Sequence, residues 1–219
     1  GALAKRLSEL EPALKTRARE LADSLEQQTA TSEILRVISG SPTDIVPVLQ
    51  VVAEHAMRLC QSSDARIWLV AGDKVKYVSG CGGIAPANVG DTMPINRGSG
   101  PGRAILDRKP VHIADASLVS EDDFPFVRKM QRLHGHRTSL IVPLLRKNEA
   151  LGAIVLRKMV VKPFTDAQIA LVKTFTDQAV IAIENVRLFN ETTEALEQQT
   201  ATAEILRVIS QSQTDVQPV

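Results

Sequence analysis

The sequence predicts an α+β domain set between two long helices, and three observations support this fold class. Short runs rich in aliphatic and β-branched residues, bounded by turn residues, predict strands at 65–70, 75–81, 92–95, 111–114, 139–145 and 151–157. No Gly or Pro occurs between Thr165 and Pro218, which predicts one helix of roughly 45 residues, or about 70 Å. Apolar residues near the N-terminus recur with three-four spacing, as in a coiled coil.

These elements divide the chain into four parts. We expect an N-terminal helix over 1–40, a domain core over 41–164 and a long C-terminal helix over 165–210. Residues 211–219 then open a further unit, because residues 196–219 repeat residues 25–48 with 19 of 24 positions identical. The repeat predicts a tandem array of such units in a longer parent protein.

Composition excludes several function classes. Hydrophobic residues make up 44% of the chain and charged residues 23%, the net charge is +1, and aromatic residues make up only 3%. This balance argues against nucleic-acid and membrane binding, and no apolar run approaches the length of a membrane span. Cys60 and Cys81 fit neither a metal-ligand spacing nor a disulfide framework, so we expect a reducing, cytoplasmic location.

Cap and stop signals place the shorter helices. Pro12 interrupts the first helix, so we expect its regular part to start near Ala13. Asp44 is a predicted N-cap for a helix over 45–60, and Pro101 opens a short helix. Gly135 ends a helix over 124–133, and the Thr165 to Gln168 segment is a capping box for the long helix.

The long helices carry apolar seams that predict a parallel homodimer. A helix that extends so far beyond a small domain needs a partner for its apolar stripe. The predicted interface residues are Leu14, Leu21, Leu25, Val172, Phe175, Ala179, Ala182, Val186, Phe189 and Leu196.

Several motifs, in their order along the chain, resemble the GAF domain family over about residues 41–190. They are Gly102-Arg103, the segment from Pro110 to Asp115, two predicted strands that begin at Ser139 and at Leu151, the segment from Pro163 to Asp166, and the segment from Gln178 to Asn185. The resemblance implies a GAF/PAS-like six-stranded antiparallel sheet flanked by helices, with a pocket on one face under residues 82–135. The repeated LEQQTAT and EILRVIS segments resemble the connectors of bacterial multi-GAF sensors, which usually end in a histidine kinase or a nucleotide cyclase.

Six residues are the candidates for binding a small molecule in that pocket: Gly100, Gly102, Arg103, His112, Arg137 and Ser139. A glycine-rich turn that opens a helix exposes N–H groups to anions, and Arg103 adds a fork of donors. The same turn is also explained by a tight structural bend, and Arg137 and Ser139 also by capping of the preceding helix or contact with solvent.

No bilin, haem, metal or cyclic nucleotide is expected, and the ligand stays unidentified. Bilin-binding members attach their chromophore through a pocket Cys often followed by His, whereas Gly82 follows Cys81 here. His112, His134 and His136 do not form a convergent ligand set. The Asn and Glu of the cyclic-nucleotide motif are replaced by Arg157 and Ala167.

The resemblance implies a non-catalytic sensory module that relays a signal through dimeric helices. The expected partners are a second copy, a small molecule and the adjacent GAF and output domains of the parent. Two alternatives stay open: a structural dimerisation spacer, and an enzyme similar to the GAF-like methionine sulfoxide reductases, which use several pocket cysteines.

Overall fold

The computed structural model describes residues 2–40, 43–84 and 88–212, and it contains the expected six-stranded sheet. The strand order is β3-β2-β1-β6-β5-β4, and every neighbouring pair is antiparallel. The strands are β1 (Asp64–Ala71), β2 (Lys74–Gly82), β3 (Thr92–Pro94), β4 (Val111–Ile113), β5 (Thr138–Arg146) and β6 (Glu149–Lys158). The predicted fold class is therefore confirmed.

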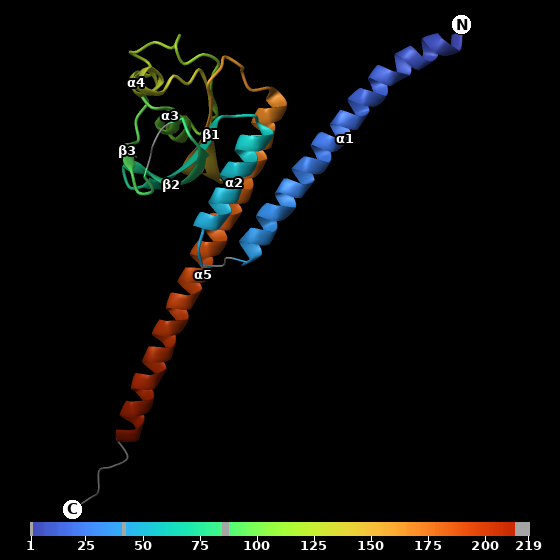
Figure 1. Ribbon diagram of the computed structural model, residues 1–219. Coiled ribbons are helices and arrows are strands. Elements are labelled where there is room, and N and C mark those ends of the chain that lie inside the picture. The colour runs from blue at the N-terminus through green and yellow to red at the C-terminus, as the bar shows by residue number, and fades with distance from the viewer. Residues whose placement is uncertain (1, 41–42, 85–87, 213–219) are drawn as a thin grey trace, which may run out of the picture.

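The two faces of the sheet carry separate cores because successive side chains of a strand point to opposite faces. On the face that we call the helix face, Ile67, Leu140 and Leu156 pack against α2 (Val46–Leu59) and α5 (Asp166–Ser212). On the opposite face, which we call the pocket face, Ile141 and Val155 pack near α3 (Gly100–Asp107) and α4 (Pro125–His134). Figure 1 shows α2 and α5 on one side of the sheet and α3 and α4 on the other.

The cap signals at Thr165 and Gly135 are confirmed, whereas the N-cap of α2 is Ile45 and not the predicted Asp44. The Asp44 carboxylate accepts a hydrogen bond from the Val46 amide at 2.9 Å, at the start of α2. The Thr165 and Gln168 side chains each accept from the other residue's amide at 3.2 Å, so the capping box of α5 is formed. Gly135 ends α4 with a φ of 74°, a left-handed conformation that costs glycine little.

The first helix is regular over more of its length than predicted. The backbone of α1 (Ala2–Gly40) is helical through Pro12, so the expected start near Ala13 is wrong. A proline removes one intrahelical hydrogen bond, and the turns on both sides carry the helix past it. Ala30 and Ile34 are fully buried in the helix-face core, and the Glu33 carboxylate lies 2.9 Å from Nε2 of His55 on α2.

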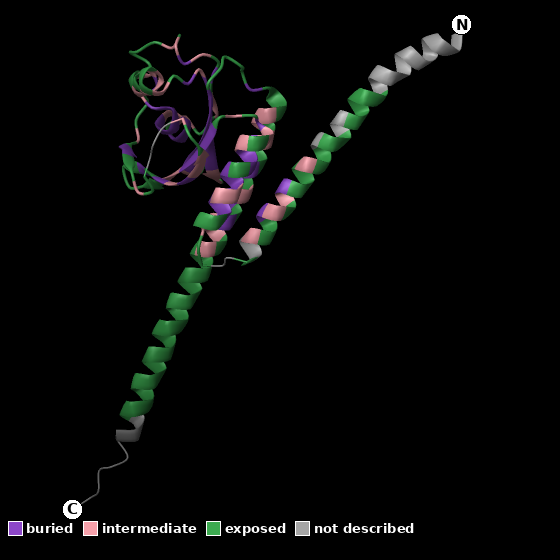
Figure 2. Ribbon diagram, in the orientation of Figure 1, coloured by how far each residue is buried: buried purple, intermediate pink, exposed green. Residues whose placement is uncertain are grey.

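The long C-terminal helix is confirmed: α5 has 47 residues, and its C-terminal half extends far beyond the sheet (Figure 1). Its first half packs on the domain and its second half is exposed, as the colours of Figure 2 show. The predicted dimer seam must therefore be corrected in part, because four of its residues are buried in the chain's own core. They are Val172, Phe175, Ala179 and Ala182.

The rest of the predicted seam is accessible. Leu14, Leu21 and Leu25 on α1 and Phe189 and Leu196 on α5 are exposed, and Val186 is partly exposed.

Of the expected next unit over 211–219, residues 213–219 lie outside the described residues. Within the described part of the chain, no helix combines the length and apolar character needed to cross a membrane.

Candidate functional site

A cavity of about 360 Å³ lies on the pocket face of the sheet, under α3 and α4. Its floor consists of alternate residues of β1, β5 and β6, and its walls come from β3 and the two short helices. Small-molecule sites in proteins start at about 300 Å³. The cavity is therefore large enough for a ligand of one or two rings.

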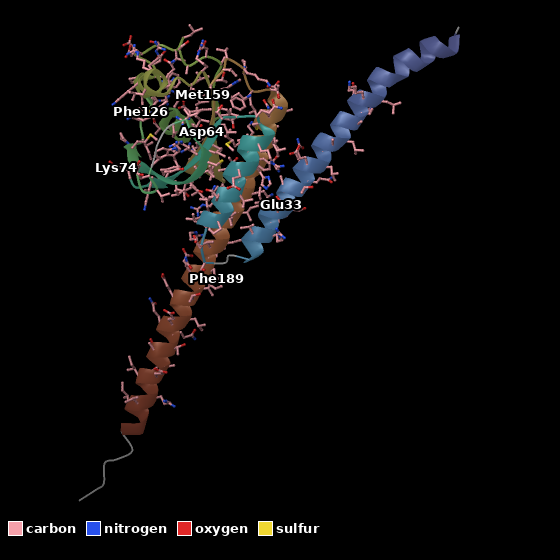
Figure 3. All side chains as sticks on the ribbon, in the orientation of Figure 1. Glu33, Asp64, Lys74, Phe126, Met159 and Phe189 are labelled. Carbon is pink, nitrogen blue, oxygen red and sulfur yellow. The ribbon has the colours of Figure 1, made fainter. Side chains whose placement is uncertain are left out.

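Apolar side chains form most of the cavity wall. Trp68 on β1, Met93 on β3 and Ile141 on β5 contribute from the sheet, and Phe126 and Met130 contribute from α4. Figure 3 shows Phe126 at the α4 side of the domain. This wall favours a ligand with an apolar body, since burying apolar surface is the main non-directional gain on binding.

A buried ionic group forms the polar part of the cavity floor. Arg66 and Arg157 line the cavity and are each 7% exposed, and Asp64 between them is fully buried. Arg157 donates to both carboxylate oxygens of Asp64, one of them at 2.9 Å, and Arg66 donates its Nε–H to the same carboxylate at 3.2 Å. In Figure 3, Asp64 lies inside the domain.

His136 and Ser139 line the cavity and are nearly fully buried. Nδ1 of His136 is shielded from solvent and has no hydrogen-bond partner among the described residues. Burial and the neighbouring Arg157 charge lower the pKa of His136 to about 4, so its ring is neutral at pH 7.

Two of the six predicted ligand residues, Gly100 and Ser139, line this cavity. Gly102 does not line the cavity, and a glycine is required there by the close packing of the turn that precedes α3. A Cβ atom there would lie 2.1 Å from the Asn96 carbonyl oxygen, and the Gly102 amide already donates to Ser99 Oγ at 3.1 Å. The structural explanation of the glycine-rich turn therefore holds at this position.

The other three predicted residues also lie away from the cavity lining. Arg103 donates to the carbonyl oxygens of Arg97 and Asp123, and its guanidinium stacks on the Phe124 ring. His112 accepts from the Phe164 amide at 3.0 Å.

Arg137 forms a two-point ion pair with Asp115, at 3.0 and 2.7 Å. The guanidinium holds the pKa of that carboxyl well below its usual range. The side chains of Arg103, His112 and Arg137 therefore form hydrogen bonds with other groups of the protein.

Neither cysteine lines the cavity. Sγ of Cys60 lies near the Gln168 carbonyl oxygen, and Sγ of Cys81 lies 3.5 Å from Met57 Sδ on α2. Burial raises the pKa of each thiol to about 11, which leaves both protonated and weakly nucleophilic. Among the described residues, no group of three or more His, Cys, Asp or Glu side chains could hold a metal ion.

Sequence reasoning missed the charged floor of the cavity: Asp64, Arg66, Arg157 and the neighbouring His136. A signal was present, because Asp64 and Arg66 occupy alternate positions with Trp68 in an otherwise apolar strand. Alternation places all three on one face, so a charged pair on a buried strand marks a polar site.

Comparisons with known proteins agree with this geometry. The model of the GAF domain family matches residues 44–183. No curated protein sequence matches the chain.

Among solved structures, the GAF domain of an Acinetobacter phosphoenolpyruvate-protein phosphotransferase has a TM-score of 0.61 at 16% identity, over 75% of this chain and 97% of that one. A methyl-accepting chemotaxis protein fragment has a TM-score of 0.60 at 22% identity, over 73% of this chain and 97% of that one. A free methionine-R-sulfoxide reductase from Neisseria meningitidis, solved with its substrate, has a TM-score of 0.61 at 16% identity, over 74% and 90%.

At these identities the structural matches show a shared fold and nothing finer. The family match spans the sheet, α2 and the part of α5 that packs on the domain. The chain therefore belongs to the GAF domain family, whose members are commonly regulatory sensory domains of signalling proteins.

Proposed function

We propose that this chain is a non-catalytic sensory module of a bacterial signal-transduction protein. It binds a small molecule non-covalently in the cavity on the pocket face. Occupancy of the cavity alters the arrangement of α1 and α5 in a parallel homodimer, and these helices pass the change to adjacent GAF and output domains. The proposal includes a cytoplasmic location, which the two free thiols favour.

One observation carries this proposal: the cavity lies on one face of β5 and β6, and α5 packs on the opposite face of the same strands. Ile141 and Val155 line the cavity, while their chain neighbours Leu140 and Leu156 belong to the core under α2 and α5. Packed cores transmit small displacements because they are dense. A ligand that shifts β5 or β6 therefore acts directly on the base of α5.

Two further features support binding over the alternatives. A dimerisation spacer needs no cavity, and the volume of about 360 Å³ favours a binding role. An enzyme of the methionine sulfoxide reductase kind needs reactive thiols in the pocket, whereas both cysteines here lie away from the lining. The exposed seam of α5 favours dimerisation.

Native mass spectrometry of the purified chain tests this function. We expect a dimer that carries a small molecule, or that acquires one from a metabolite mixture with a rise in melting temperature. Val155→Phe fills the cavity floor and should abolish the added mass while circular dichroism stays unchanged. A dimer that never gains mass, with a melting temperature insensitive to the mixture, would support the spacer alternative.

A further inference from the structure

We propose that the cavity takes a small organic monocarboxylate, with its carboxylate on Arg66 and an apolar body of one or two rings against Trp68 and Phe126. This inference rests on the proposed function and names the chemical class of the ligand.

The charge of the buried floor points to a single negative charge. Arg66 and Arg157 carry two positive charges, Asp64 carries one negative charge, and the neutral His136 ring adds none. The remaining charge of +1 is almost fully removed from water, where an unbalanced charge is costly. A monoanion balances it, whereas a phosphate dianion overcompensates it.

The hydrogen bonds of the two arginines show which one is free to bind. Arg157 is held by two bonds to Asp64, but Arg66 uses only Nε. No hydrogen bond among the described residues uses the two terminal nitrogens of Arg66. These nitrogens can donate two parallel hydrogen bonds to a carboxylate, whose single charge also matches that of the cavity floor.

The register of the sheet gathers the polar groups at one place. Arg157 pairs with Asp64 on β1 and with Ser139 on β5, and Arg66 pairs with Val155 on β6. Asp91 also lines the cavity, but it is exposed at the β3 edge, where water screens its charge. The cavity therefore has an apolar body and a cationic end, which is the pattern of an amphipathic acid.

Matched acids and amides test the inference even while the natural ligand is unidentified. The probes are phenylacetate, 3-phenylpropionate and indole-3-acetate, each compared with its carboxamide by isothermal titration calorimetry. Trp68 is the only tryptophan and lines the cavity, so its fluorescence independently reports occupancy by the two phenyl pairs. A charge-assisted bond to Arg66 predicts that the best acid binds at least about tenfold more tightly than its amide.

Arg66→Met should remove this preference, and Arg132→Met should leave it unchanged. Arg66→Met is expected to fold because Arg157 still pairs with Asp64. Arg132 is an exposed residue of α4 that pairs with Glu121 outside the cavity. Melting temperatures of both variants check the fold, and the acid-to-amide ratio in the unmodified protein decides the question if Arg66→Met is unstable.

Two negative results separate this inference from the proposed function. Amides that bind as well as their acids, or an acid preference that survives in Arg66→Met, would overturn the carboxylate assignment and leave small-molecule binding intact. Failure of all six compounds to bind, together with no retained molecule in native mass spectra, would overturn both.

Discussion

Replacing Phe189 by Ala should weaken the proposed dimer strongly. Phe189 lies where α5 leaves the domain (Figure 3), and 45% of its surface is exposed in the single chain. A phenylalanine side chain offers about 200 Å² for burial, so about 90 Å² remains available to a partner. At about 25 cal/mol per Å², this gives about 2 kcal/mol per chain and about 4 kcal/mol for the dimer.

The alanine methyl group keeps part of this contribution. We therefore expect the dimer dissociation constant to rise by about two to three orders of magnitude, at 1.4 kcal/mol for each factor of ten. Sedimentation equilibrium over a wide concentration range measures this change. Circular dichroism should show unchanged helix content, because the side chain is not part of the domain core.

Leu188→Ala is the matched control. Leu188 is 51% exposed, but it lies outside the three-four seam that Val186, Phe189 and Leu196 share. Its replacement should change the dissociation constant by less than about threefold, since the helix turns about 100° per residue. Equal effects of the two substitutions would show nonspecific association, and a monomeric unmodified protein would refute the seam itself.

Three further predictions follow from burial, charge and helix phase. Ile34→Ala should lower the free energy of urea unfolding by about 2–5 kcal/mol, because Ile34 is fully buried. Ile205 occupies the same position in the second copy of the repeat but is exposed, so Ile205→Ala should lower this free energy by less than about 0.5 kcal/mol. Equal losses in the two variants would contradict the packing of α1 on the domain. The folded pKa of His136 lies below its ordinary value, so stability is full above about pH 6.5 and falls toward pH 4 by at most about 3 kcal/mol. Urea unfolding at a series of pH values should show this loss, and His136→Gln should flatten it; an unchanged slope in the variant would rule out His136 as the source. In a parent protein with an output domain, inserting seven residues near Glu194 should preserve the output activity, because seven residues nearly restore the helix phase. Inserting two to four residues should change the output activity. Output activity that is the same for all insertion lengths would favour the spacer alternative.

Local signals predicted most of the fold. Turn residues, strand alternation and caps act within a few residues, so the capping roles of Thr165 and Gly135 could be predicted from the sequence. The prediction at Pro12 was wrong because a proline removes a single intrahelical hydrogen bond, and α1 is helical on both sides of it. The apolar seam of α5 has the same period in both halves, so it could not show that Val172 to Ala182 pack within the chain.

The candidate site was less predictable because burial of charge is a tertiary property. Gly100 and Ser139 were expected and line the cavity. Arg103 looked suitable from its glycine-rich context, but its donors go to backbone carbonyl groups. Arg66 and Arg157 lie 91 positions apart in the sequence and meet only when β1 and β6 pair.

The distance between the two α5 helices of the dimer tests the central claim most directly. A spin label at Glu194→Cys, in a chain with both native cysteines replaced by Ala, reports that distance by double electron–electron resonance. The account predicts that a probe acid that saturates the Trp68 fluorescence change also shifts the distance distribution, and that Val155→Phe abolishes both effects. A distance distribution that stays the same while Trp68 reports full occupancy would contradict the relay through α5.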